Sequence, residues 1–165
     1  MTRADTGMHQ LVINIADALL QKQYFLATAE SCTGGLIARE LTSLAGSSNW
    51  FDCGFVAYSN AAKSNMLGVN PISVSDNGAV SLQVVAEMAE GALANSQASI
   101  SVATSGIAGP GGGSEDKPLG TVCFAWAEKG KNTRTEKKCF DGDRESVRKQ
   151  AVKYALQGIL QNLSD

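Results

Sequence analysis

Histidine is almost absent from this chain, and the residues that usually build a metal site are not grouped. His9 is the only histidine, and none of the four cysteines belongs to a C-x-x-C pair. A structural zinc site needs ligands at short spacings, so we expect no metal. A Ser-His-Asp triad is also disfavoured, because His9 falls in a helix-like segment where a lone histidine is most often a surface or core residue.

The sequence also lacks a long apolar run, a targeting signal and an excess of basic residues. No segment approaches membrane-spanning length, and residues 1–10 contain no apolar signal core. The net charge is −2, which gives no support to a broad nucleic-acid surface. We therefore expect a cytoplasmic protein with reduced thiols, no cofactor, and no membrane or nucleic-acid partner.

The sequence does contain a regular alternation of helix-like and strand-like segments within 165 residues, enough for one domain with a buried core. The patterns predict helices at 9–21, 34–44, 63–67, 81–95 and 141–163, and strands at 24–29, 50–58, 99–104, 120–128 and 133–140. Residues 68–78 are predicted to be a loop. This order favours a three-layer α/β/α sandwich with a mixed, mostly parallel sheet and one antiparallel hairpin.

The stretch AESCTGG, residues 29–35, places small polar side chains and two glycines on a strand-to-helix turn. Such a turn can present a serine hydroxyl beside backbone N–H groups that would hold an oxyanion. Ser31 is therefore a candidate nucleophile that needs a base. The alternative for Ser31 and Thr33 is helix capping. Cys32 has no histidine to activate it and is interpreted as a buried structural thiol.

The stretch FVAYSNAAK, residues 55–63, offers a base without histidine. Tyr58 ends a predicted strand, and Lys63 lies in the first turns of the next helix, where the helix dipole and burial both depress a lysine pKa. A neutral lysine, or a tyrosine phenolate stabilised by a lysine cation, would deprotonate a serine. The alternative is a solvated Lys63 and a Tyr58 that caps the core.

A glycine-rich stretch at 104–120, TSGIAGPGGGSEDKPLG, follows another predicted strand. Its spacing matches neither the P-loop nor the dinucleotide fingerprint. Glycines nevertheless let backbone amides approach an anion closely, and a flexible connection is the alternative. Because all three stretches follow strands, we expect them to converge at one edge of the sheet.

The last helix begins with FDGDRESVRK, residues 140–149. Asp141 or Asp143 is predicted to cap it. Arg144 and Arg148 lie four residues apart on one helical face, and an arginine pair can clamp a phosphate. For Arg148 we favour surface pairing with an acid such as Glu145.

Four ordered motifs carry a resemblance to a known family. AESCTGG, YSNAAK with LGV after it, TSGIAGPGGGSEDKPLGTV and FDGDRESVR resemble the CinA carboxy-terminal domain family, the competence/damage-inducible protein A relatives. The resemblance spans about residues 8–160 and implies one α/β/α domain over 1–165 with its core at about 8–163. It further implies hydrolysis of the carboxamide of nicotinamide mononucleotide to nicotinate mononucleotide and ammonia, without a metal.

The resemblance also assigns roles to residues. Ser31 would be the nucleophile, and Tyr58 and Lys63 would activate it. The residues that would bind the substrate are Thr33, Gly34, Gly35, Asn60, Thr104, Ser105, Gly106, Gly109, Gly111, Gly112 and Arg144.

Two other functions stay open on the sequence. One is a catalytically inactive nucleotide-binding or regulatory relative with the same fold. The other is a different small-amide hydrolase that uses the same serine. A homodimer is also possible, because the apolar helix face at 84–93 would suit either an intrachain core or a subunit interface.

Overall fold

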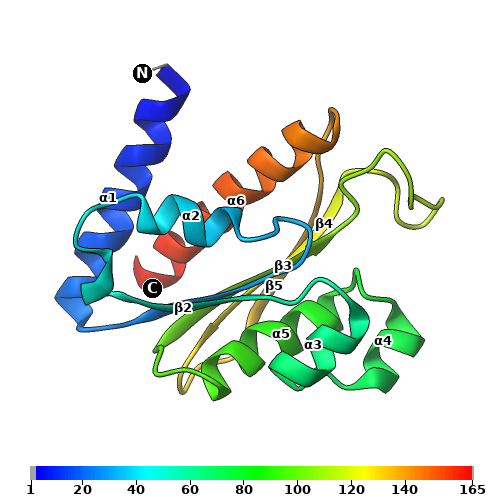
Figure 1. The fold of residues 1–165 in the computed structure, drawn as a ribbon, viewed down its shortest axis with the longest axis horizontal. Coiled ribbons are helices and arrows are strands. Elements are labelled where there is room, and N and C mark those ends of the chain that lie inside the picture. The colour runs from blue at the N-terminus through cyan, green and yellow to red at the C-terminus, as the bar shows by residue number, and fades with distance from the viewer. Residues whose placement is uncertain (1–2, 165) are drawn as a thin grey trace.

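The computed structural model describes residues 3–164, with side chains from residue 6 onward, and its elements follow the predicted order (Figure 1). The helices are α1 (Arg3–Lys22), α2 (Leu36–Thr42), α3 (Asn60–Leu67), α4 (Pro71–Asn77), α5 (Leu82–Ala94) and α6 (Arg144–Ser164), with a 3₁₀ turn at Ser47–Asn49. The strands are β1 (Leu26–Glu30), β2 (Phe51–Val56), β3 (Ile100–Gly106), β4 (Thr121–Glu128) and β5 (Arg134–Cys139).

The five strands form one mixed sheet in the order β2-β1-β3-β4-β5. β1 pairs in parallel with β2 and with β3, whereas β4 is antiparallel to both of its neighbours. The α/β class and the β4–β5 hairpin are therefore confirmed. "Mostly parallel" fits loosely, because two of the four strand pairs are parallel and two are antiparallel.

Helices cover both faces of the sheet, which gives the three layers that the sequence predicts (Figure 1). One face packs under α1, α2 and α6 around large side chains such as Leu19, Phe124 and Trp126. The other face carries alanines and packs under α3 and α5, where Val84, Val85 and Met88 are fully buried. The apolar face of α5 is therefore intrachain core.

The prediction of a loop at 68–78 is wrong, because residues 71–77 form α4. Asn70 caps this helix by accepting a hydrogen bond from the backbone N–H of Ile72, and Pro71 occupies the first turn. Glu87 of α5 holds the same segment in place by accepting hydrogen bonds from the Asn70 N–H and the Ser73 hydroxyl.

Side-chain caps fix the starts of two helices that border the site. The Ser59 hydroxyl accepts from the Ala62 N–H at the start of α3. At the start of α6, Asp143 rather than Asp141 is the cap, and its carboxylate accepts from the Ser146 N–H. Within residues 3–164, none of the helices is both long enough and apolar enough to cross a membrane.

Candidate active site

The carboxyl ends of the three adjacent strands β2, β1 and β3 meet at one edge of the sheet, as the sequence predicts. Ser31 follows β1, Lys63 lies on α3 after β2, and Thr104 lies near the end of β3. The Ser31 N–H donates to the Thr104 carbonyl at 3.0 Å. The Thr33 and Thr104 hydroxyls are hydrogen-bonded at 2.8 Å. β3 therefore fixes the turn that carries the serine.

Lys63 and Ser31 are in direct contact inside the protein. The lysine Nζ lies 3.0 Å from the serine Oγ, and the two residues are 1% and 8% exposed. Lys63 Nζ also donates to the backbone carbonyls of Ala57 at 3.2 Å and Tyr58 at 3.0 Å. The solvated alternative for Lys63 is thereby excluded.

The surroundings of Lys63 favour its neutral form. Burial lowers the pKa of its ammonium below the usual 10.5. Among residues 6–164, none of the ion pairs includes Lys63. A neutral amine that donates its two hydrogens to the two carbonyls has its lone pair left for the Ser31 hydroxyl. This arrangement suits a general base.

The hydroxyl of Tyr58 is hydrogen-bonded to Arg144, and not to Ser31 or Lys63 as expected of an activating residue. Its side chain is 57% exposed, and its hydroxyl accepts a hydrogen bond from Arg144 at 3.0 Å. Only the backbone carbonyl of Tyr58 contacts Lys63. Arg144 also donates to the Gly109 carbonyl at 2.9 Å, so the phenol and the glycine-rich loop share one guanidinium.

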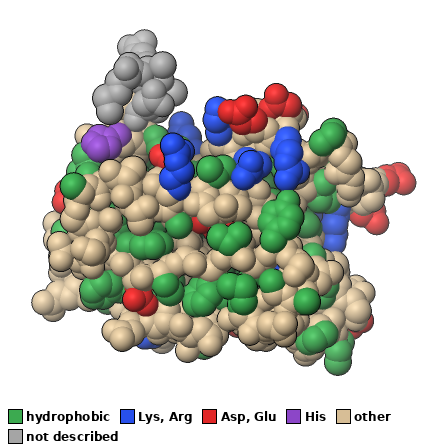
Figure 2. Space-filling model, viewed as in Figure 1, with side chains coloured by type: hydrophobic (Ala, Val, Ile, Leu, Met, Phe, Trp, Pro, Cys, Tyr) green, Lys and Arg blue, Asp and Glu red, His purple; other side chains and the backbone are tan. Residues whose placement is uncertain are grey.

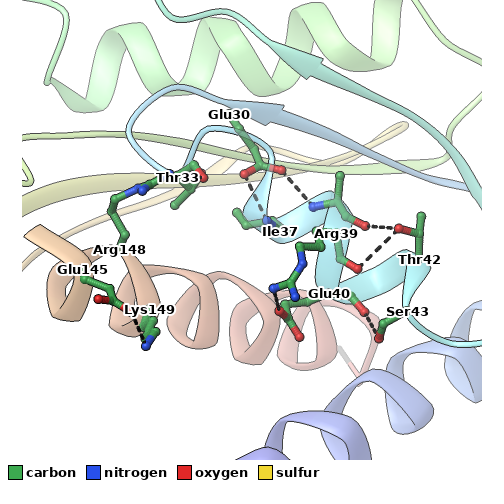
Figure 3. Close-up of polar contacts among 11 residues, drawn as sticks. Glu30, Thr33, Ile37, Arg39, Glu40, Thr42, Ser43, Glu145, Arg148 and Lys149 are labelled. Atoms are coloured by element: carbon green, nitrogen blue, oxygen red, sulfur yellow. Dashed lines mark hydrogen bonds and ion pairs between the residues drawn. The ribbon is translucent and has the colours of Figure 1, made fainter.

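Contrary to the capping alternative, the side chains of Ser31 and Thr33 do not cap α2. The residue at the N-cap position of this helix is Gly35, which has no side chain that could cap it. The fully buried carboxylate of Glu30 caps the helix instead, because it accepts from the backbone N–H group of Ile37 (Figure 3) and from those of Gly35 and Ala38, all at 2.9–3.0 Å. Sequence reasoning missed Glu30, although an acid at the start of a helix is a usable signal.

The amides of Gly34 and Gly35 are therefore already engaged within the protein. The Gly35 N–H donates to Glu30, and the Gly34 N–H donates to the Ser31 carbonyl at 3.0 Å. Among residues 6–164, the amides of Cys32 and Thr33 donate to no other residue, and the Cys32 N–H contacts only its own thiol. The donors left beside the serine are thus the amides one and two residues after it.

Arg148 corrects another expectation, because it does not pair with Glu145 at the surface. Its Nε donates to the Cys32 carbonyl at 3.1 Å, and its Nη2 lies 3.4 Å from the Thr33 carbonyl. Glu145 forms its ion pair with Lys149 instead (Figure 3). Arg148 of α6 is thus hydrogen-bonded to the turn at residues 31–35, which is called the serine turn below.

Cys32 and His9 both match the structural interpretation of the sequence. Burial raises the pKa of the Cys32 thiol to about 12, so the thiol stays protonated. His9 is exposed on α1 (Figure 2). All four cysteines are free.

The glycine-rich loop leaves β3 beside the serine turn. A Cβ at Gly106 would lie 2.7 Å from the Val122 side chain and 3.0 Å from Cys32 Sγ, so packing demands glycine there. Gly109 and Gly112 have positive φ angles of 89° and 92°. The exposed Gly111 lines a hollow of about 590 Å³ along the loop.

Two predicted substrate residues have other surroundings. The Ser105 hydroxyl donates to the Ala79 carbonyl, which connects β3 to the α4–α5 loop. Asn60 is exposed at the start of α3 and lines a hollow of about 500 Å³. A further groove of about 540 Å³ lies between α1, α2 and α6, and both Arg144 and Arg148 line it. Basic side chains gather over α2 and α6 (Figure 2).

The fold and the site together define a class: an α/β/α sandwich with a buried serine and lysine in contact where its parallel strands end. The chain belongs to the CinA family, since the model of the CinA C-terminal domain matches residues 8–163.

Relatives of similar length support this assignment. Nicotinamide-nucleotide amidohydrolase PncC of Enterobacter agglomerans is 53% identical over 95% of this chain and 96% of its own length. The PncC protein of Escherichia coli K12 is 50% identical over 95% of each chain. The crystal structure of competence damage-inducible protein A of Klebsiella pneumoniae superposes with a TM-score of 0.91 at 43% identity, and it covers 95% of this chain and 97% of that one.

Proposed function

We propose that this protein hydrolyses the carboxamide of nicotinamide mononucleotide to nicotinate mononucleotide and ammonia, with Ser31 as the nucleophile. The observation that carries the proposal is the 3.0 Å contact between the buried Lys63 Nζ and Ser31 Oγ. A serine needs a base to become nucleophilic, and a neutral lysine is a base that requires no histidine. The names of the PncC relatives support a nicotinamide nucleotide as the substrate.

The first half of the reaction forms an acyl-enzyme. Ser31 Oγ attacks the carboxamide carbon while Lys63 Nζ takes the hydroxyl proton, and the carbonyl oxygen becomes an oxyanion. The N–H groups of Cys32 and Thr33, which donate to no other residue, stabilise that oxyanion. The intermediate collapses when the C–N bond breaks, and the leaving nitrogen takes the proton from Lys63 and departs as ammonia.

The second half of the reaction regenerates the serine. A water molecule attacks the ester carbon, and Lys63 removes its proton. The C–O bond to Ser31 then breaks, Lys63 returns the proton to Oγ, and the carboxylic acid leaves. Lys63 thus acts as base and then as acid in each half, with the amides of Cys32 and Thr33 in the same role in both.

The substrate phosphate is assigned to the glycine-rich loop and Arg144. Arg144 donates hydrogen bonds to the Gly109 carbonyl and the Tyr58 hydroxyl. Because a guanidinium carries five N–H donors, further donors are available for an anion. Tyr58 then belongs to the rim that holds the ring or ribose, and Lys63 alone is the base.

The test is ammonia release from nicotinamide mononucleotide by wild type, Ser31→Ala and the control Ser99→Ala, whose hydroxyl lies near the opposite end of β3. We expect Ser31→Ala to lose about a thousand-fold or more in kcat, as nucleophile removal does elsewhere. Unchanged turnover in Ser31→Ala would rule out the nucleophile.

The alternatives give other results in the same assay. Tight binding of nicotinamide mononucleotide by calorimetry without ammonia release favours the inactive nucleotide-binding relative. Release from nicotinamide, nicotinamide riboside or glutamine, but not from the mononucleotide, favours a different small-amide hydrolase.

A further inference from the structure

The serine turn is held from both helical layers at once. Lys63 reaches it from α3 on one face of the sheet, whereas Arg148 reaches it from α6 on the other face (Figure 1). The Arg148 side chain is half-buried and extends toward Thr33 (Figure 3). Among residues 6–164, none of the ion pairs includes Arg148, so its charge acts on the backbone of the turn.

The two carbonyls that Arg148 contacts are linked covalently to the free amides. The Cys32 carbonyl, 3.1 Å from Arg148 Nε, belongs to the same peptide unit as the Thr33 N–H. A cation at the oxygen of a peptide unit draws electron density from its nitrogen and makes the N–H a stronger donor. Arg148 therefore polarises the Thr33 N–H directly.

The second free amide is connected to Arg148 through one more peptide unit. The Thr33 carbonyl, 3.4 Å from Arg148 Nη2, shares its peptide unit with the Gly34 N–H. That N–H donates at 3.0 Å to the Ser31 carbonyl, which in turn shares its unit with the Cys32 N–H. Chains of hydrogen bonds strengthen one another in this way in a medium of low dielectric constant.

We propose that Arg148 is a positioning residue of the reaction, which orients and polarises the Cys32 and Thr33 amides that stabilise the oxyanion. The proposal rests on the proposed function, since it requires Ser31 to generate that oxyanion. Dipoles that are fixed before the reaction stabilise developing charge without reorganising. Glu30 complements the effect, because it occupies the competing amides of Gly35, Ile37 and Ala38.

The turn is shaped to admit a guanidinium. Gly34 has a φ of +58°, and a Cβ on it would lie 3.1 Å from Arg148 Nη2. A planar guanidinium reaches two neighbouring carbonyls with separate N–H groups, whereas a lysine ammonium is a single point charge on a flexible stem. Lysine at position 148 should therefore restore only part of the effect.

The test is steady-state kinetics of ammonia release by wild type, Arg148→Ala, Arg148→Lys and the control Lys149→Ala. Lys149 is the next residue of α6 and forms an exposed ion pair with Glu145. Because the oxyanion is absent from the bound substrate and forms only during the reaction, we expect kcat of Arg148→Ala to fall about ten- to a hundred-fold with little change in KM. Arg148→Lys should fall less, and Lys149→Ala should match wild type.

A purely structural role is separated by chemical rescue. Arg148 lines the groove of about 540 Å³, so a small alkylguanidinium ion can enter the space that Arg148→Ala vacates. We expect millimolar ethylguanidinium to raise kcat of Arg148→Ala severalfold and to leave wild type unchanged. If Arg148→Ala does not fold, as judged by circular dichroism, the partial kcat of Arg148→Lys at unchanged KM is the decisive measurement.

Other outcomes overturn the proposal. A rise in KM at constant kcat would make Arg148 a substrate contact, and a kcat loss that neither lysine nor ethylguanidinium relieves would make it a structural residue. Full activity in Arg148→Ala together with an inactive Ser31→Ala would refute only the role of Arg148. Full activity in Ser31→Ala would refute the proposed function itself.

Discussion

Lys63 shows at the scale of one residue how burial changes the acidity of an ordinary side chain. A lysine ammonium in water is well hydrated, but here it is 1% exposed and faces two carbonyls and a hydroxyl without a carboxylate partner. Burial therefore lowers its pKa. In the proposed mechanism, the neutral form of this amine removes the proton of the Ser31 hydroxyl that it contacts.

The pH dependence of the reaction should report this lowered pKa. We expect kcat/KM to rise with pH and to reach a plateau at an apparent pKa below 10.5, because only the neutral amine accepts a proton. Lys63→Met should lose the rising limb and about a hundred-fold or more in kcat/KM. Measuring ammonia release from pH 5 to 10 tests both expectations.

The control is Lys129→Met in the exposed β4–β5 turn, which should keep the wild-type profile.

Stability gives a second readout that requires no substrate. Between the lowered pKa and 10.5 the unfolded chain binds a proton that the native protein lacks, so the unfolding free energy rises with pH in that window. Lys63→Met should lack this contribution, and an equal slope in both proteins would contradict the lowered pKa.

At the scale of elements, two helices approach their neighbours so closely that only glycine fits. A Cβ at Gly158 of α6 would lie 2.1 Å from the indole ring of Trp126 on β4. A Cβ at Gly91 of α5 would lie 1.9 Å from the Leu67 carbonyl at the end of α3. α3 carries Lys63 and α6 carries Arg148. These close contacts therefore fix how near each helix lies to its neighbours, and with that the position from which each side chain reaches the serine turn.

A matched pair of glycine substitutions should therefore change stability in opposite directions. Gly158→Ala must displace the Trp126 ring, and we expect it to lower the unfolding free energy by about 1–3 kcal/mol. Gly7→Ala in α1, where no atom lies within 4 Å of the added Cβ, should raise it by about 0.5–1 kcal/mol. Urea unfolding of both variants tests the pair, and stabilisation by Gly158→Ala would contradict the packing.

At the scale of the whole molecule, one continuous sheet supports two separate cores. The core under α1, α2 and α6 contains both tryptophans, whereas the core under α3 and α5 is built mainly from alanine, valine and methionine. The proposed site depends on both, because Lys63 reaches Ser31 from one layer and Arg148 reaches the Cys32 carbonyl from the other.

We expect the two layers to unfold together, since they share every central strand. Tryptophan fluorescence reports on the layer of Trp50 and Trp126, while far-ultraviolet circular dichroism reports on all helices. The two urea transitions should coincide, as in a single cooperative domain. A loss of helical signal at a urea concentration where fluorescence is still native would show that α3–α5 unfold independently.

The sequence by itself determined the order of the elements (except α4), the cap of the last helix and the candidates for nucleophile and base. These properties are local, because hydrophobic periodicity and capping preferences act within a few residues. Ser31 stood out as a polar residue just after a predicted strand, and Lys63 stood out as a lysine in the first turns of the next predicted helix. Even α4 had a local signal in Asn70-Pro71, which the interpretation of residues 68–78 as a loop passed over.

Only the tertiary structure decided which groups meet. The contact of Arg148 with the Cys32 carbonyl joins residues 116 positions apart, and Tyr58 found its hydrogen-bond partner in Arg144 at a separation of 86. Both arginines and Tyr58 contact partners that no local pattern identifies, since a carbonyl or a phenol becomes a neighbour only when the layers pack. The burial that lowers the pKa of Lys63 arises in the same step.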